Sequence, residues 1–258
     1  MKIAVLIKRV PDTASVFKIG PDGKSVELSG LKYVMSPYDE HAVEEAIKTK
    51  EAGEAEVVLV SLGGEEVKET IRQGLAMGAD RGLLVTGAGL DGATSRGIAE
   101  ALAAALKKEA PDLVLAGKQA VDDDAAQVPE RVGEILGLPH ASVVTRLELR
   151  EGKAEVDREV EGGQYTLELP LPALFSLEKG INTPRYPTLP NIMKAKKKPI
   201  DTVTLADLGL DAGALAGALR VATMALPRQD RRNKIIEGEP GDAVKRLLTA
   251  LREEEQVI

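Results

Sequence analysis

The residues best placed to bind a ligand lie in the stretch 112–130. An apolar run at 113–116 breaks at Gly117, and a polar loop with the aspartates Asp122–Asp124 then leads to a helix expected to begin near Ala125. In an open parallel sheet, ligands bind beyond the carboxyl ends of the strands. A helix that starts there presents free N–H groups to an anion such as phosphate, so the stretch predicts a nucleotide-binding loop. The alternative is that the aspartates only cap the helix, because Asp accepts hydrogen bonds from the first helical turn.

Two further loops follow apolar runs in the same way. The run at 2–8 ends at Lys8 and Arg9, two basic groups suited to the rim of a ligand crevice, although an ordinary solvated loop would look the same. The run at 57–60 ends at Ser61–Gly64. Because the carboxyl ends of parallel strands meet at one edge of a sheet, the three loops predict a nucleotide-sized site there. The chain lacks a Gly-x-Gly-x-x-Gly turn and a Gly-Lys-Ser/Thr loop, which disfavours a standard dinucleotide dehydrogenase or a phosphate-loop hydrolase.

The elements that must position these loops alternate along the first part of the chain. Ser36 as N-cap and Pro37 at the first helical position predict the start of a helix. One-sided apolar faces predict this helix, at 42–47, and three later helices, at 67–75, 98–106 and 128–136. Apolar runs predict strands at 57–60, 82–85, 113–116 and 141–144. The alternation predicts an α/β fold with a doubly wound, mostly parallel sheet.

From Arg146 onward the pattern changes. Apolar and polar residues alternate across turns at Gly152 and at Gly162–Gly163, which predicts antiparallel strands added to the sheet, followed by an apolar strand at 173–176. A weaker alternation at 16–29 predicts a small hairpin. We therefore divide the chain into a nucleotide-binding domain at 1–181, a partner-recognition loop with a basic helix at 182–199, and a C-terminal arm at 200–258.

Two segments outside the sheet suggest contacts with other proteins. In 182–199, Leu189 stands between prolines, and an apolar side chain held in this way loses little entropy when it docks. The alternative is that Leu189 packs on its own domain and Lys196–Lys198 are merely solvated. The arm is charged at 228–234 and ends in a helix whose apolar stripe packs either on the domain or on another subunit; the stripe consists of Val244, Leu247, Leu248 and Leu251.

Composition excludes several classes of function. A net charge of −7 argues against nucleic-acid partners, and the absence of Cys removes thiolate chemistry and iron–sulfur ligation. Only His41 and His140 are present, so we expect no metal site. No apolar run approaches the roughly 18–20 residues of a membrane span, and the N-terminus lacks a secretory pattern, so we expect a cytoplasmic protein without membrane insertion.

Five stretches carry a resemblance to a known family, the beta (small) subunit of electron transfer flavoprotein. They are VLIKRVPD at 5–12, MSPYDE with AVEEA at 35–46, ETIR through AMGADRG at 69–82, GKQAVDDD at 117–124 and PRYPTLPNIMKAKKK at 184–198. The resemblance covers nearly the whole chain, and the last two stretches are its most specific parts. It implies an adenine-nucleotide alpha-hydrolase-like fold and an electron-carrier subunit that is not an enzyme by itself and has no catalytic residues.

The resemblance also implies cofactors, partners and site residues. A larger alpha subunit would carry most of the FAD site, and this chain would hold a structural AMP, form one wall of the flavin cleft and wrap its arm around the alpha subunit. Electrons would pass from acyl-CoA dehydrogenases of fatty acid beta-oxidation, docked at Leu189, Arg185, Tyr186, Ile192 and Met193, to the membrane-bound electron transfer flavoprotein quinone oxidoreductase. The AMP site would comprise Leu6, Ser36, Pro37, Tyr38, Asp39, Leu62, Gly117, Lys118, Gln119, Ala120, Val121, Asp122, Asp123, Asp124, Ala125, Ala126, Gln127 and Val128, with backbone N–H groups of the last three residues at the phosphate.

The sequence departs from the family pattern in two places. Members that bind AMP often have Asn and Thr where this chain has Ala126 and Val128, and Ala-Gln-Val also occurs in relatives that bifurcate electrons and hold a second FAD. The alternative is therefore a bifurcating subunit that oxidises NADH, although the three aspartates favour AMP. Thr13 stands where some members have an aromatic residue near the flavin. A third possibility, from a different class, is a nucleotide-binding sensor or ATP-cleaving domain that acts alone.

Overall fold

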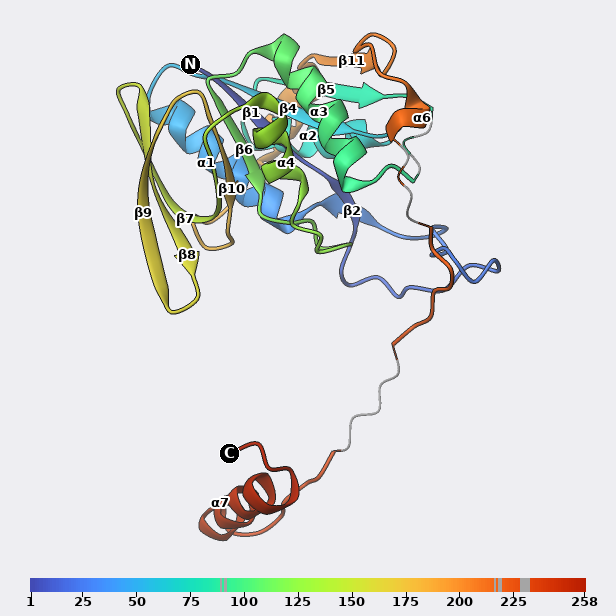
Figure 1. Ribbon diagram of the computed structural model, residues 1–258, viewed down its shortest axis with the longest axis vertical. Coiled ribbons are helices and arrows are strands. Elements are labelled where there is room, and N and C mark those ends of the chain that lie inside the picture. The colour runs from blue at the N-terminus through green and yellow to red at the C-terminus, as the bar shows by residue number, and fades with distance from the viewer. Residues whose placement is uncertain (89, 91, 216, 218–219, 228–232) are drawn as a thin grey trace. The chain divides into compact units, whose positions relative to one another are not determined.

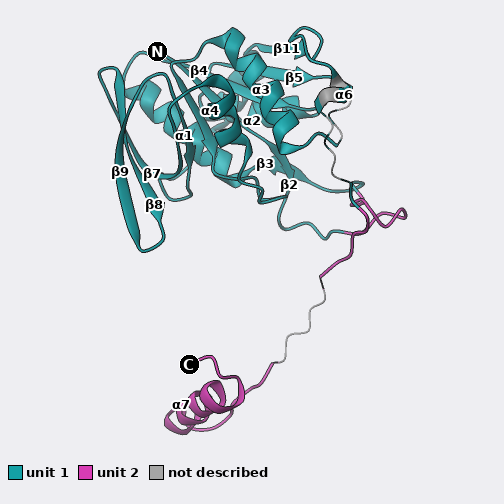
Figure 2. Cartoon of the chain, viewed as in Figure 1, with its two compact units in different colours: residues 1–17, 28–221 teal, residues 18–27, 222–258 magenta. Residues whose placement is uncertain are grey.

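The computed structural model describes residues 1–88, 90, 92–215, 217, 220–227 and 233–258. The described residues form two compact units, one of residues 1–17 and 28–221 and the other of residues 18–27 and 222–258 (Figure 2). The larger unit contains the whole nine-stranded sheet. Most of the charged stretch predicted at 228–234 lies outside the described residues.

The sheet of the larger unit contains the predicted apolar runs and further strands. Its strand order is β11 (Ile200–Thr204), β5 (Arg81–Thr86), β4 (Glu56–Leu62), β1 (Lys2–Leu6), β6 (Leu113–Gly117), β10 (Ala173–Leu177), β7 (His140–Arg150), β8 (Lys153–Val160) and β9 (Gly163–Pro170). All neighbouring strands from β11 to β7 pair in parallel, whereas β8 and β9 are antiparallel additions. The large, mostly parallel sheet with antiparallel strands at one end confirms the predicted α/β class.

Helices cover both faces of this sheet (Figure 1). Along β1, Ile3 and Val5 belong to one buried cluster and Ala4 and Leu6 to the other, as the period of two in a strand requires. The first cluster includes side chains of α1 (Pro37–Ala52) and α2 (Val67–Met77), and the second includes those of α3 (Ser95–Glu109) and α4 (Val128–Leu136). The sheet is therefore doubly wound, with its parallel strands buried on both sides.

The path of the chain through the sheet determines where the site lies. From β1 the chain builds outward through β4 and β5, and then returns to place β6 on the other side of β1. A reversal of strand order of this kind leaves a crevice between the loops that follow the two central strands. The loops after β1 and β6 are two of the three that the sequence placed at one rim.

Several elements differ from the predictions. Ile200–Thr204, which the sequence placed at the start of the arm, is an edge strand parallel to β5, so the larger unit continues beyond residue 200. Arg9–Pro11 (β2) and Tyr33–Met35 (β3) form an unpredicted antiparallel pair. Within 16–29 the predicted small hairpin is present in minimal form, as one antiparallel bridge between Ile19 and Val26 with backbone hydrogen bonds from Gly20 to Ser25 and from Glu27 to Lys18.

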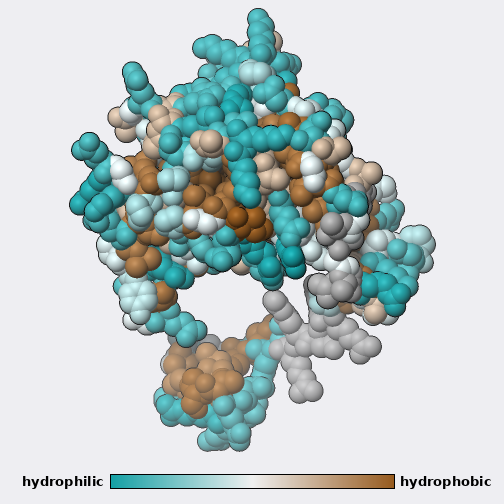
Figure 3. All heavy atoms as spheres, turned by 45° about the horizontal axis from the view of Figure 1, so that its top comes forward, coloured by the Kyte–Doolittle hydropathy of each residue, from teal (hydrophilic) through white to brown (hydrophobic). Residues whose placement is uncertain are grey.

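The smaller unit ends in α7 (Pro240–Thr249), continued by a π-helical turn at Ala250–Glu254. Val244, Leu247 and Leu248 on this helix are exposed, and Figure 3 shows apolar side chains on one side of the segment and hydrophilic ones on the other. The amphipathic helix that the apolar stripe predicted is thereby confirmed.

Candidate functional site

A cavity opens at the carboxyl ends of β1, β4 and β6, with about 800 Å³ of empty space when the part open to solvent is included. Its walls are largely apolar and include Leu6 from β1, Leu62 from β4, and Ile98 and Leu102 from α3. The loop between β6 and α4 forms another wall from Gly117 onward. Pockets with apolar walls and a few polar groups are typical of sites for small molecules and cofactors.

Asp39, in the first turn of α1, joins the two central strands at the cavity. Its Oδ2 accepts a hydrogen bond from the backbone N–H of Lys8 (2.7 Å) and its Oδ1 accepts one from the N–H of Gly117 (3.1 Å). The residue is buried, and burial raises its pKa to about 7, although the two backbone N–H donors act in the opposite direction. Asp39 therefore fixes the ends of β1 and β6 relative to α1.

Gly117 is required at this junction for steric reasons. A Cβ on Gly117 would lie 2.5 Å from Oδ1 of Asp39 and 2.6 Å from Cβ of Tyr38. Real side chains do not tolerate such distances, so only Gly allows β6 to approach the start of α1 this closely. The Gly at the strand end predicted a break in the strand, and the structure shows in addition a close approach of two backbones.

The acidic loop after β6 is bound to the end of β1 by Lys8. The Nζ atom of Lys8 lies 2.8 Å from Oδ1 of Asp122 and 3.1 Å from Oδ2 of Asp123. Burial lowers the pKa of Lys8, but the hydrogen bonds and ion pairs with the two aspartates outweigh burial and raise it. Asp124 instead accepts a hydrogen bond from Nε2 of Gln119 at 2.6 Å.

The alternative that the three aspartates cap the helix is wrong. The helix α4 begins at Val128 rather than near Ala125, and its N-cap is Gln127, which makes no side-chain capping hydrogen bond. Asp124 and Ala126 have φ angles of 47° and 48°, so the loop turns twice through the left-handed region before the helix begins. The aspartates thus stabilise the loop and Lys8, and no capping side chain occupies the N–H groups of the first turn of α4.

The structure brings most of the predicted cofactor residues together. Those that line the cavity are Leu6, Asp39, Leu62, Gly117, Lys118, Gln119, Ala120, Asp123, Ala125, Ala126, Gln127 and Val128. Ser36, Pro37, Tyr38, Val121, Asp122 and Asp124 are not among its lining residues. Within the described chain, the Ser36 hydroxyl is buried without a hydrogen-bond partner, and the Tyr38 ring lies under the Lys179 ammonium, 4.4 Å from Nζ to the ring centroid.

Sequence reasoning missed several lining residues. They are Ile7, Lys8, Ser95, Ile98, Leu102, Ala116 and Pro129. Lys8 had been placed on the rim, and its charge was the signal that could have included it. The apolar face of α3 was predicted, but the sequence contains no signal that this face reaches the cavity, because that depends on how α3 packs across the sheet.

Comparison with known proteins then decides the family. A model of the electron transfer flavoprotein domain matches residues 25–208. The chain belongs to the electron transfer flavoprotein family. It is 44% identical over 226 residues to the electron transfer flavoprotein subunit beta of Bradyrhizobium diazoefficiens, covering 87% of this chain and 90% of the relative. The identity to the electron transfer flavoprotein subunit beta of Bacillus subtilis is 38% over 259 aligned positions, which cover both chains completely. The identity to the subunit beta of Homo sapiens is 42% over 232 positions, which cover 89% of this chain and 90% of the relative.

This result confirms the resemblance drawn from the five sequence stretches. Membership of the electron transfer flavoprotein family implies association with a flavin and a role in electron transport. The matched region, 25–208, includes the loop after β6, the exposed segment around Leu189 and strand β11.

The second predicted site of this electron transfer flavoprotein chain is an exposed apolar patch around α5 (Leu189–Ala195). We define it as Tyr186, Leu189, Ile192 and Met193, whose exposed fractions are 95%, 79%, 40% and 61%. The alternative that Leu189 packs on its own domain is wrong, since the side chain faces solvent. Lys198 is not simply solvated either, because its Nζ donates to the carbonyl oxygens of Leu75 and Ala79 at the end of α2.

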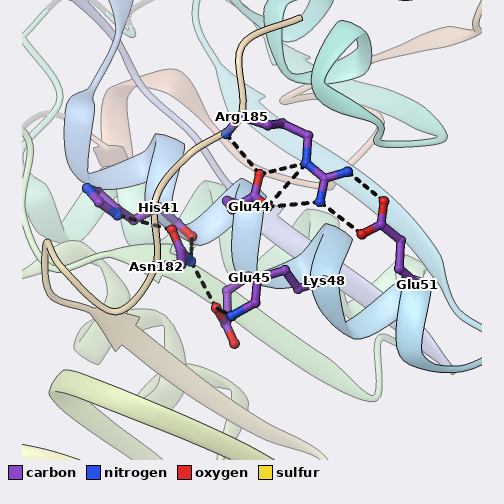
Figure 4. A network of polar contacts seen from close by, with 7 residues as sticks. All are labelled: His41, Glu44, Glu45, Lys48, Glu51, Asn182 and Arg185. Carbon is purple, nitrogen blue, oxygen red and sulfur yellow. Dashed lines mark hydrogen bonds and ion pairs between the residues drawn. The ribbon is translucent and has the colours of Figure 1, made fainter.

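Arg185 lies beside this patch but its guanidinium points to α1 (Figure 4). It donates to both carboxylate oxygens of Glu44 at 2.9–3.2 Å and to Glu51 at 2.5 and 2.9 Å. The side chain of Glu44 is only 6% exposed and that of Arg185 is 34% exposed, so the carboxylate is desolvated while the guanidinium keeps part of its contact with water. Asn182 adds hydrogen bonds to the carbonyl of His41 and to Glu45, both at 2.9 Å. Arg185 therefore anchors the segment that carries the patch.

Two structural features are absent from the described part of the chain. No group of three or more His, Cys, Asp or Glu side chains there is arranged to hold a metal ion. No helix there has both the length and the apolar character needed to cross a membrane.

Proposed function

We propose that this chain is the beta subunit of a heterodimeric electron transfer flavoprotein and that it holds AMP in the cavity. The observation that carries the proposal is the combination of apolar walls with an uncapped helix start. Leu6, Leu62, Ile98 and Leu102 offer surfaces for an adenine and a ribose. Backbone N–H groups at 126–128 and the positive end of the α4 dipole suit one phosphate group. A fold of the adenine-nucleotide alpha-hydrolase type agrees with this use of the strand ends.

The redox cofactor in this proposal is FAD, held mainly by an alpha subunit, with this chain forming one wall of its cleft. FAD would supply all of the electron chemistry, because a chain without Cys and with two His residues offers little of its own. The C-terminal arm would pack on the alpha subunit through the exposed stripe Val244, Leu247 and Leu248. Unpaired apolar faces of this kind mark protein interfaces. The relatives, all described as subunit beta, support a two-subunit assembly.

The partner that delivers electrons would dock on the apolar patch around Leu189. We assign this role to acyl-CoA dehydrogenases in the cytoplasm, with electrons passing on to electron transfer flavoprotein quinone oxidoreductase at the membrane. A few exposed apolar anchors are sufficient for the small interfaces of transient redox complexes. The ion pairs of Arg185 keep the patch in place, so little order is lost on docking.

A second candidate is a bifurcating subunit that holds a second FAD in the cavity and oxidises NADH. The residues Ala126-Gln127-Val128 favour it, since this combination occurs in bifurcating relatives. Nucleotide release from the co-purified heterodimer distinguishes the two functions when FAD and AMP are counted per dimer by chromatography. We expect one FAD and one AMP. Two FAD and no AMP would establish the bifurcating function, and one FAD with no second nucleotide would refute both.

A further inference from the structure

Lys8 connects two loops at the mouth of the cavity. It follows the end of β1, and its Nζ reaches Asp122 and Asp123 of the loop after β6 at 2.8 and 3.1 Å. Lys8 and Asp123 both line the cavity, yet their side chains remain 40% and 51% exposed. Residues that line a cavity and also face solvent must lie where the cavity opens. The ion pair therefore spans the opening from β1 to the acidic loop.

Asp123 continues this connection into the loop. While its Oδ2 faces Lys8, its Oδ1 accepts a hydrogen bond from the backbone N–H of Ala125 at 3.1 Å. The next residue, Ala126, has a φ of 48°, which a residue with a side chain adopts only when its surroundings hold it there. This turn directs the backbone of 126–128 into α4. The chain of contacts from Lys8 through Asp123 to Ala125 thus fixes the N–H groups proposed to bind phosphate.

The charges at the cavity mouth indicate that Lys8 does not itself compensate a phosphate. Its single positive charge faces two carboxylates, so it is already neutralised. Lys118, which also lines the cavity, lies 2.6 Å from Glu178 and is paired in the same way. Neither of these two lysines therefore offers a free positive charge to a bound anion.

We propose that Lys8 is a positioning residue that holds the phosphate-binding backbone of the loop in place through Asp122 and Asp123, without contacting the phosphate. The inference rests on the proposed nucleotide-binding function. The ion pair should therefore affect how tightly the phosphate of the ligand is bound and not how tightly its base is bound, because the backbone that the pair holds lies at the start of α4.

The test measures binding of AMP and of adenosine to the nucleotide-stripped heterodimer by calorimetry. The variants are Lys8→Met, the double variant Asp122→Asn/Asp123→Asn, which keeps an acceptor for the Ala125 N–H, and the triple variant.

Loss of two partly exposed ion pairs weakens AMP binding by roughly 2- to 30-fold. We expect AMP affinity to fall in this range for each variant, adenosine affinity to change less than about twofold, and the triple variant to be no weaker than Lys8→Met. Lys153→Met, which removes an equally short ion pair with Glu168 on the β8–β9 hairpin, is the matched control and should bind AMP as the wild type does.

Three results would overturn the inference. If Lys8 contacts the phosphate directly, the double Asp variant binds AMP more tightly than the wild type, because Lys8 is released from its partners. If Lys8 is a general support of the cavity, AMP and adenosine weaken equally. If Lys8→Met binds AMP with wild-type affinity, the ion pair positions nothing. Failure of the proposed function gives a different result from these three, because the wild type itself would then bind no AMP. The inference about Lys8 would fall together with the proposed function in that case.

Discussion

Replacing Asp39 with Asn tests how the two central strands are joined at the cavity. The carboxylate accepts one backbone N–H with each oxygen, from Lys8 at 2.7 Å and from Gly117 at 3.1 Å. An amide of the same shape has only one acceptor oxygen, and its NH2 group must face the other N–H donor. A buried donor without a partner costs about 1–3 kcal/mol, so Asp39→Asn should lower the free energy of unfolding by about that amount at pH 5, where the neutral carboxyl group keeps a lone pair on each oxygen.

The size of the effect should depend on pH. The pKa of Asp39 is raised by burial from its ordinary value near 3.8 to about 7 in the folded protein. The folded state therefore binds the proton more tightly than the unfolded state, so the stability that Asp39 contributes is largest in acid and is lost as the pH rises toward 7. Between pH 5 and pH 8 this loss amounts to about 2–3 kcal/mol. The advantage of the wild type over Asp39→Asn should accordingly be larger at pH 5 than at pH 8.

Urea unfolding of the wild type and the variant at pH 5, 6.5 and 8, without added nucleotide, measures this difference, because all other titrating groups are common to both proteins. Asp112→Asn is the matched control, since Asp112 accepts the single N–H of Lys2 at 2.7 Å and an amide oxygen can do the same. It should change stability by less than about 1 kcal/mol. If the difference for Asp39→Asn instead grows between pH 5 and pH 8, the two N–H donors outweigh burial, and our account of the raised pKa is wrong.

Three further substitutions test the junction, the anchor and the patch. Gly117→Ala places a Cβ 2.5 Å from a carboxylate oxygen of α1 and should cost at least about 1–3 kcal/mol of thermal stability. The control Gly53→Ala, whose Cβ would have no atom within 4 Å, should be neutral. Equal melting temperatures of the two variants would contradict the close approach. Arg185→Ala removes the guanidinium from the buried carboxylate of Glu44, which keeps the backbone N–H of residue 185 as a donor at 3.1 Å, and should destabilise by about 1–3 kcal/mol in urea unfolding; an unchanged unfolding midpoint would contradict the anchoring role. Leu189→Ala should slow electron acceptance from an acyl-CoA dehydrogenase by about tenfold or more while flavin content stays unchanged, and a loss of flavin or unimpaired coupling would disprove the docking role.

Much of the fold and of the rim could be predicted from local patterns. The strands β1, β4, β5 and β6 were visible as apolar runs because they are buried on both faces, and their helices were visible as faces of period 3.6. The loop after Gly117 was placed at the site because parallel strands bring their carboxyl ends to one edge. The alternative that failed there was helix capping by the aspartates, two of which pair instead with Lys8, more than a hundred residues away.

The sequence by itself determined the alternation of strands and helices, the class of fold and the three loops at one edge, since each depends on residues close together in the chain. Only the tertiary structure decided which distant groups meet. It made Ile200–Thr204 a strand beside β5, gave Asp39 its two backbone donors, and bound Arg185 to α1. These contacts join residues from about thirty to more than a hundred positions apart, and no local periodicity records them. The free energy that each of these contacts costs or contributes depends on burial and on the distance between charges. Burial and these distances are defined only once the chain has packed.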